Sequence, residues 1–206
     1  MFVVIAGIIG AGKTTLTTAL AAELRGQAFF EPVETNPYLE DFYGDMERWG
    51  FTMQMYLLAQ RFHQHQQLVW SATPAVQDRS IYEDVAFSRV LRASGHINER
   101  DFRTYESHFR TMIRFLVYPD VIFYLDVSPE TALRRVQERA RGCETGMTLD
   151  YLVRLRVEYE RLMDELRNYT TVARLDWENP MSPADVAQIA RSVSNATRPF
   201  SRTLQL

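Results

Sequence analysis

A glycine-rich loop directly after an apolar run is the feature that most constrains this fold. Residues 7–14 read Gly-Ile-Ile-Gly-Ala-Gly-Lys-Thr and match the pattern G-x-x-x-x-G-K-[ST] at every position. A short apolar run at 2–6 precedes the loop, and a helical pattern follows from residue 13. A strand–loop–helix unit of this kind turns its backbone N–H groups inward at a helix N-terminus. It therefore predicts an anion nest for the phosphates of a nucleoside triphosphate.

The loop also contains side chains suited to a triphosphate. Lys13 places a point charge near the β- and γ-phosphates, and the Thr14 hydroxyl is a suitable Mg²⁺ ligand. Lys13 is the only lysine among 23 basic residues, so a chain that otherwise uses arginine keeps its lysine in this motif. The residues expected to contact ATP here are Gly7, Gly10, Ala11, Gly12, Lys13, Thr14 and Thr15.

Short apolar runs alternate with longer helical patterns along the chain. The runs cover 2–6, 28–30, 74–77, 121–125 and 172–175, and the helical patterns cover 13–25, 50–70, 82–94, 98–116, 129–140, 149–167 and 183–195. This alternation predicts an α/β fold with a central parallel sheet of about five strands flanked by helices. Continuous apolar runs further predict strands that are covered on both faces. We expect one domain over 1–196 and a loose tail over 197–206.

Composition narrows the classes of function. The net charge is −3 with both signs interspersed, which argues against a nucleic-acid-binding face. No apolar run reaches the roughly 18 residues of a membrane span, and residues 1–6 read as a core strand, not a signal peptide. The single cysteine, Cys143, allows no internal disulfide and favours a cytoplasmic location. The four histidines have no metal-binding spacing.

Three carboxylates follow predicted strands. Glu31, Asp78 and Asp126 come directly after three of the apolar runs. The carboxyl ends of parallel strands meet at one edge of the sheet, where open α/β folds bind ligands. A helix cap or a solvated turn is the alternative for each, and for Asp126 the two interpretations are equally supported. The guanine-reading motif N-K-x-D of GTPase switches is absent, since the only lysine is Lys13.

Several further motifs occur in order at characteristic spacings. They are EPV at 31–33, RW at 48–49 followed by FTMQ at 51–54, DRSIYED at 78–84, and R-x-x-x-R-x-R at 135–141. Together they resemble the deoxynucleoside kinase family over residues 2–166. The resemblance implies a P-loop kinase fold with an arginine-bearing lid, which transfers phosphate from ATP to the 5′-hydroxyl of a deoxynucleoside with Mg²⁺ as cofactor.

The resemblance assigns catalytic roles to residues whose chemistry suits them. Glu31 corresponds to the general base that accepts the proton of the 5′-hydroxyl. Arg79 lies near the transferred phosphoryl group, where a forked cation stabilises charge. Asp78 is expected to bind the metal together with Thr14, and Lys13 completes the catalytic set.

The nucleoside base is expected to contact a helix over 50–70. Gln54 can read a base edge because it both donates and accepts hydrogen bonds. In the family, the position of Met53 packs on the base, and Arg61 with Asp84 forms a pair on the far side of the pocket. That pair argues against thymidine, whereas Leu57 blurs the preference. A purine deoxynucleoside is favoured, and deoxycytidine is the second candidate.

The resemblance also implies a sugar clamp, a lid and a homodimer. Tyr43 and Glu144 correspond to the pair that binds the 3′-hydroxyl, although Tyr43 on its own reads as a core tyrosine. The lid arginines correspond to Arg135, Arg139 and Arg141, which can close over ATP and exclude water.

Two alternatives stay open at this point. A nucleoside monophosphate kinase of the thymidylate type shares the P-loop, the strand-end Asp-Arg and an arginine lid, but it needs more cations in its acceptor pocket. A regulatory module could retain the P-loop without chemistry, yet it would have no use for Glu31, Asp78 and Arg79.

Overall fold

The computed structural model describes residues 1–31, 36–139, 146–179 and 181–196. Its sheet has five parallel strands in the order β2-β3-β1-β4-β5. The strands are β1 (Phe2–Ala6), β2 (Gln27–Phe29), β3 (Ala75–Asp78), β4 (Val121–Asp126) and β5 (Thr171–Asp176). The prediction of an α/β fold with five parallel strands is thereby confirmed.

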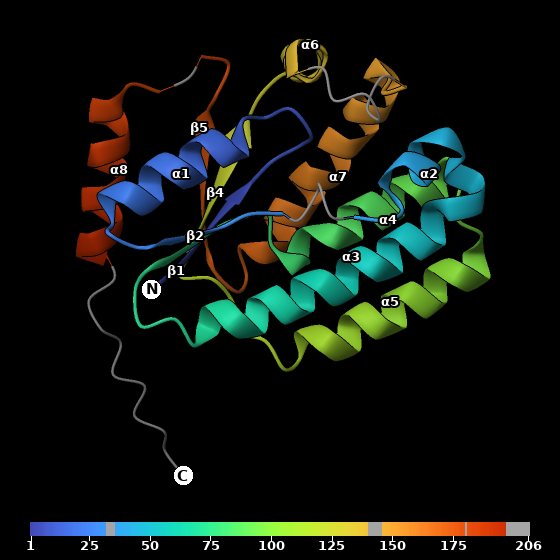
Figure 1. Ribbon diagram of the computed structural model, residues 1–206, viewed down its shortest axis with the longest axis horizontal. Coiled ribbons are helices and arrows are strands. Elements are labelled where there is room, and N and C mark those ends of the chain that lie inside the picture. Colours follow the sequence, from blue (N-terminus) through green and yellow to red (C-terminus); the bar gives the residue numbers. More distant parts are fainter. Residues whose placement is uncertain (32–35, 140–145, 180, 197–206) are drawn as a thin grey trace.

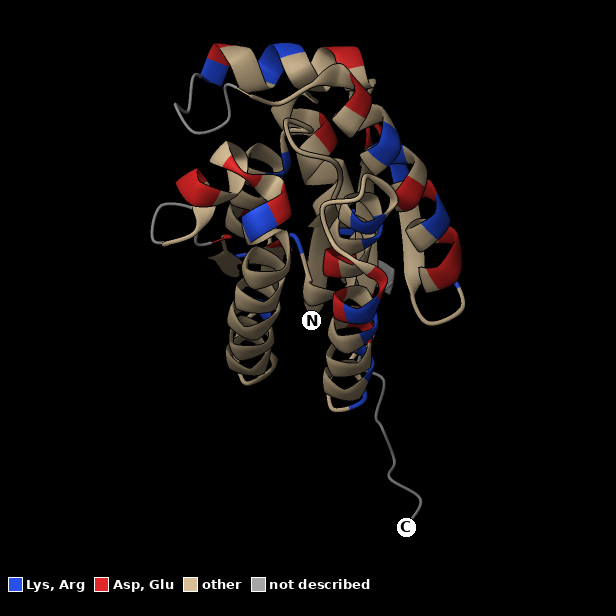
Figure 2. Cartoon of the chain, turned by 90° about the vertical axis from the view of Figure 1, so that its right-hand side faces the viewer, with Lys and Arg blue, Asp and Glu red and all other residues tan. Residues whose placement is uncertain are grey.

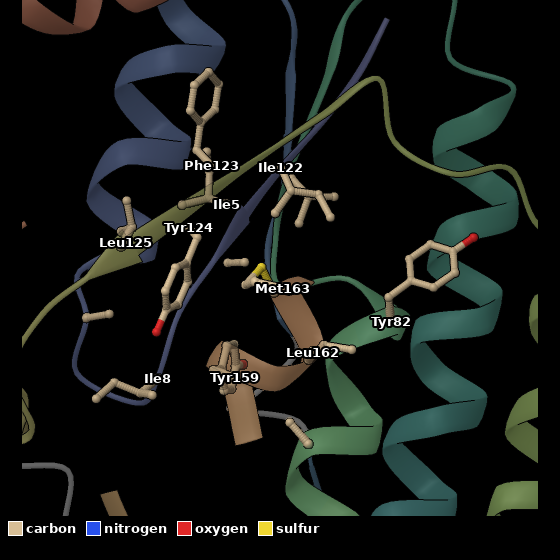
Figure 3. Packing of buried hydrophobic residues seen from close by; sticks show 14 of the residues in the cluster. Ile5, Ile8, Tyr82, Ile122, Phe123, Tyr124, Leu125, Tyr159, Leu162 and Met163 are labelled. Atoms are coloured by element: carbon tan, nitrogen blue, oxygen red, sulfur yellow. The ribbon is translucent and has the colours of Figure 1, made fainter. Parts of the chain in front are cut away.

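The helices are α1 (Lys13–Glu23), α2 (Leu39–Gly44), α3 (Met46–Val69), α4 (Asp84–Ala93), α5 (Glu99–Ile113), α6 (Pro129–Arg139), α7 (Leu149–Leu166) and α8 (Pro183–Ala196). Helices α1 and α8 cover one face of the sheet, and α3, α4, α5 and α7 lie on the other (Figure 1). β1, β3 and most of β4 are buried, so these strands form the centre of the core. Ile5, Ile122 and Met163 are among the side chains that join strands and α7 there (Figure 3).

Helix boundaries differ from the sequence pattern where local capping decides them. α3 begins at Met46, four residues before the predicted start, because the Asp45 carboxylate caps it by accepting from the Arg48 N–H at 2.9 Å. Helix α2 was absent from the predicted pattern. Residues 81–83 form a 3₁₀ turn before α4, with a capping box between Ser80 and Glu83.

The helices carry both basic and acidic side chains. On the side shown in Figure 2, basic and acidic residues are interspersed. Several form ion pairs one helical turn apart, such as Arg103 with Glu99 at 3.0 Å and Arg154 with Asp150 at 2.7 Å. Among the helices described, none has the length and apolar character to cross a membrane. The cytoplasmic location stays a prediction.

Candidate active site

A cavity of about 800 Å³ lies at the carboxyl edge of the sheet, beside the glycine loop. Its wall combines the loop with residues at the ends of β2 and β3 and with side chains of α2, α3, α4, α6 and α7. The predicted site residues that line it are Gly10, Gly12, Lys13, Thr14, Thr15, Glu31, Tyr43, Met53, Gln54, Asp78, Arg79, Arg135 and Arg139. Residues that are far apart in the sequence thus meet at one opening.

Four other predicted residues lie behind this wall, and two cannot be placed. Gly7 and Ala11 are buried in the loop, and Arg61 and Asp84 are buried in the interior. Arg141 and Glu144 fall outside the described residues.

The glycine loop is held by close packing. Gly10 has φ +80°, and a Cβ there would lie 2.3 Å from the carbonyl oxygen of Ala132 in α6. Gly12 has φ +94° and precedes α1, and its Cβ would lie 2.9 Å from Nε1 of Trp177. Both positions need a residue without a side chain, because the backbone angle and the neighbours exclude one.

Lys13 and Thr14 follow the loop at the start of α1. The Lys13 ammonium donates to the Ile8 carbonyl at 2.9 Å. Burial, aided by Arg79, lowers its pKa to about 8. The Thr14 hydroxyl donates to Asp78 Oδ2 at 2.5 Å, which joins α1 to the end of β3.

The pair of Thr14 and Asp78 offers oxygen ligands for a hard cation. Asp78 Oδ1 is buried and has no hydrogen-bond partner among the described residues. The described chain contains no cluster of three or more His, Cys, Asp and Glu residues that could hold a metal ion. The Thr14 hydroxyl and the Asp78 carboxylate fit Mg²⁺, which needs only one or two protein ligands when phosphates and water supply the others.

Glu31 lies between two arginines. Its Oε1 accepts from Arg61 Nη2 at 2.5 Å, and its Oε2 accepts from Arg79 Nη1 at 3.0 Å. Burial raises the pKa of Glu31, but Arg79, Arg61 and Lys13 overcome this and lower the pKa to about 2. Glu31 is therefore a carboxylate at neutral pH, and it faces the cavity with its side chain 17% exposed.

Arg61 bridges Glu31 and Asp84. Its Nη1 forms an ion pair with Asp84 Oδ1, while its Nη2 holds Glu31. Asp84 is completely buried, and burial raises its pKa to about 7 although the Arg61 charge opposes the shift. The predicted pairing of Arg61 with Asp84 occurs, and it extends to the carboxylate proposed as the base.

Arg79 has a left-handed backbone, with φ +62°. This region is uncommon for residues other than glycine and concentrates at functional sites. The guanidinium reaches Glu31 and also donates from Nη2 to the Gly7 carbonyl at 3.5 Å. The Cζ atom of Arg79 lies 4.6 Å from the centre of the Phe87 ring. Arg79 therefore contacts the base candidate, the phosphate loop and an aromatic wall at once.

Arg135 and Asp126 were both named from the sequence, but only Arg135 lines the cavity. Arg135 donates to the Ala11 carbonyl at 3.1 Å and to the Trp177 and Glu178 carbonyls at 2.9 Å, so it joins the glycine loop to the segment after β5. Asp126 does not line the cavity. It forms ion pairs with Arg156 at 2.9 Å and Arg174 at 2.8 Å.

Sequence reasoning did not find every residue of the cavity wall. Leu39 and Phe42 come from α2, Phe87 from α4, and Tyr151 from α7. Each is an apolar or aromatic residue in a helix, and such residues usually belong to the core. Only a prediction of α2 itself could have directed attention to the first two.

The glycine loop on a parallel sheet, the strand-end carboxylates and the adjoining cavity define a P-loop kinase. The family model described as "Deoxynucleoside kinase" matches residues 3–197. The chain belongs to the deoxynucleoside kinase family.

Individual relatives agree with that assignment. The chain is 42% identical to a deoxyadenosine kinase of Dictyostelium discoideum over 95% of its own length and 80% of the relative. It is 38% identical to a deoxyadenosine/deoxycytidine kinase of Bacillus subtilis over 77% of this chain and 74% of that one. A solved structure of deoxyadenosine kinase from M. mycoides, with dCMP and dCDP bound, superposes with a TM-score of 0.85 at 28% identity. It covers 95% of this chain and all of the other.

Proposed function

We propose that the chain uses ATP and Mg²⁺ to phosphorylate the 5′-hydroxyl of a purine deoxynucleoside, with deoxycytidine as the second candidate substrate. The observation that carries the proposal is the position of Glu31, a carboxylate held by two arginines in the wall of a cavity that also contains the glycine loop. In-line attack needs a base and a phosphoryl donor on one opening, and this cavity offers both.

The residues divide the reaction between them. Glu31 orients the 5′-hydroxyl and accepts its proton as the oxygen attacks the γ-phosphorus, and the bond from that phosphorus to ADP breaks. Arg79 stabilises the negative charge on the transferred phosphoryl group, because its guanidinium lies between Glu31 and the glycine loop. Lys13 and the loop N–H groups hold the phosphates of ATP.

Thr14 and Asp78 are the proposed ligands of Mg²⁺. When bound, the ion neutralises charge on the β- and γ-phosphates. The buried Asp78 Oδ1, which lacks a hydrogen-bond partner in the described parts of the chain, supports this assignment.

Base recognition is assigned to α3. Gln54 is 2% exposed and lines the cavity, and its Oε1 is buried without a hydrogen-bond partner among the described residues. An unsatisfied buried acceptor costs free energy until a ligand donates to it. The amino group of adenine, or that of cytosine, supplies such a donor, and this supports the proposed substrates. Met53 is proposed to pack on the base, Tyr43 and Glu144 to bind the 3′-hydroxyl, and Arg139 and Arg141 to close over ATP with Arg135.

A nucleoside monophosphate kinase is less well supported. A charged acceptor needs free cations, whereas Arg61 is engaged by two carboxylates and Arg79 by one. A regulatory module is disfavoured by the intact set of Glu31, Asp78 and Arg79.

We also propose a homodimer. Helix α7 exposes Leu149, Val153 and Val157, which lie on one face at intervals of four residues. Multi-angle light scattering would give twice the chain mass for a dimer, and the monomer mass would refute it. Val157→Arg on the same face should shift the equilibrium toward monomer.

The reaction is tested with Mg·ATP and a panel of acceptors: deoxyadenosine, deoxyguanosine, deoxycytidine, thymidine and thymidine monophosphate. We expect turnover of deoxyadenosine or deoxyguanosine, weaker turnover of deoxycytidine, and none of thymidine. Glu31→Gln should lower kcat by about 10²–10⁴-fold, the usual contribution of a general base. Turnover of the monophosphate alone would refute the proposal.

A further inference from the structure

Glu83 is a buried carboxylate that the reaction as described does not use. It is 1% exposed and ends the 3₁₀ turn between β3 and α4, four residues after Arg79. It does not line the cavity and is absent from the predicted site.

Both oxygens of Glu83 accept hydrogen bonds. Oε1 accepts from the Ser80 N–H at 2.8 Å and from the Ser80 hydroxyl at 3.4 Å. Oε2 accepts from the Tyr159 hydroxyl at 2.9 Å and from the Gly7 N–H at 3.4 Å. One carboxylate thus connects the residue after Arg79, the first residue of the glycine loop and helix α7.

These contacts hold the backbone at Gly7 and directly after Arg79, two residues of the proposed active site. Gly7 donates its N–H to Glu83 and accepts from Arg79 through its carbonyl, so its peptide units are held from two sides. Ser80 directly follows the left-handed Arg79. A strained backbone of this kind persists only where its surroundings fix it, and the bond from Ser80 N–H to Glu83 is such a constraint.

The donor set requires a carboxylate. The two backbone N–H groups can only donate, and each needs an acceptor. An amide at this position would turn an NH₂ group toward one of them. Burial raises the pKa of Glu83, and the charges of Arg79 and Lys13 oppose the shift.

A capping role alone would involve only Oε1. The capping box with Ser80 accounts for that oxygen, whereas Oε2 contacts Gly7 and Tyr159, which belong to other elements. We infer that Glu83 is a positioning residue: it holds Arg79 and Gly7 in register for phosphoryl transfer, and Tyr159 orients its carboxylate. This inference rests on the proposed function, which gives Arg79 its role.

The test compares Glu83→Gln with a matched control. Asp185 forms an equivalent capping box at the start of α8, where it accepts from the Ser182 N–H at 3.0 Å and the Ser182 hydroxyl at 2.7 Å, and it is exposed. Asp185→Asn therefore makes the same carboxylate-to-amide change without a link to the site. For each variant we would measure kcat, KM for deoxyadenosine, Mg·ATP affinity by calorimetry, and the unfolding midpoint.

We expect Glu83→Gln to lower kcat by about tenfold or more with KM for deoxyadenosine changed less than about threefold, because small displacements of reacting groups slow the chemical step. Mg·ATP affinity should fall by about threefold, and Asp185→Asn should leave kcat within about twofold of wild type. Unchanged kcat with only a lower unfolding midpoint would overturn the inference and leave Glu83 as a cap.

A second variant decides the matter if Glu83→Gln does not fold. Tyr159→Phe removes one hydroxyl from a buried ring and keeps its packing. We expect kcat to fall by about threefold or more, and wild-type kcat would overturn the inference. If wild type turns over no deoxynucleoside, the proposed function fails separately. In that case the affinity of Glu83→Gln for Mg·ATP tests the positioning role of Glu83. An affinity equal to that of wild type would mean that Glu83 does not hold Gly7.

Discussion

Two carboxylates at the same edge of the sheet each lie between two arginines, yet they belong to different kinds of site. Glu31 contacts Arg61 and Arg79, whose side chains are 3% and 6% exposed. Asp126 contacts Arg156 and Arg174, whose side chains are 34% and 41% exposed. The local charges are alike, and the difference is burial.

Burial changes what an ion pair does. An exposed pair gains little, because water already solvates both charges and salt screens them. A buried pair has lost that solvation, so removing one partner leaves a charge without compensation. The buried charges around Glu31 therefore each need their partners for compensation. The charges around Asp126 stay solvated, and their ion pairs join β4, β5 and α7 at the surface.

The largest expected difference concerns the arginines. Arg79→Lys keeps the charge but loses the planar fork that reaches both Glu31 and Gly7, so kcat should fall by about 10²-fold or more. Arg174→Lys, the same change beside Asp126, should leave kcat within about twofold of wild type. Steady-state kinetics of both variants checks the comparison, and equal losses would contradict it.

The second expected difference between the two sites is in the free energy of unfolding. Arg61→Leu leaves Glu31 and Asp84 without their shared cation, and the free energy of unfolding should fall by about 3–5 kcal/mol. Arg174→Leu should lower it by less than about 1 kcal/mol. Urea unfolding of both variants measures the two values. Similar losses would show that burial is not the deciding factor.

Histidines extend the comparison to pH. His65 is buried, and burial lowers its pKa to about 4 from 6.5, while the Val117 backbone opposes the shift. The unfolded chain therefore binds the proton more readily. Up to about 3 kcal/mol of stability, present above pH 6.5, should be lost as pH falls toward 4. His65→Leu should flatten this pH dependence, whereas His108→Leu, at an exposed position, should not.

The smallest effect tests the exposed network itself. A double-mutant cycle of Asp126→Asn and Arg174→Gln should give a coupling free energy of less than about 1 kcal/mol that shrinks further in 1 M salt. Thermal unfolding at two salt concentrations provides the measurement. A coupling that resisted salt would mean that this pair is more shielded from water than its exposure indicates.

Much of the fold follows from local patterns. The five strands and most helices were predicted because apolar periodicity reports which face of an element is covered. The start of α3 was misplaced, since its first turn is capped by Asp45 and carries charged residues. Helix α2 was not predicted because six residues are too few for a periodic signal. The site residues were named from motifs.

The glycine loop, the helix–strand alternation and the family can all be read from the amino-acid sequence alone. These depend on spacing within short segments, where backbone angles and side-chain period are set locally. Three contacts became visible only in the folded chain: Arg61 joins Glu31 to Asp84, Asp126 pairs with surface arginines, and Glu83 reaches Gly7 and Tyr159, each 76 positions away in the sequence. Such contacts depend on how helices pack on the sheet, and packing removes some charges from water while it leaves others exposed.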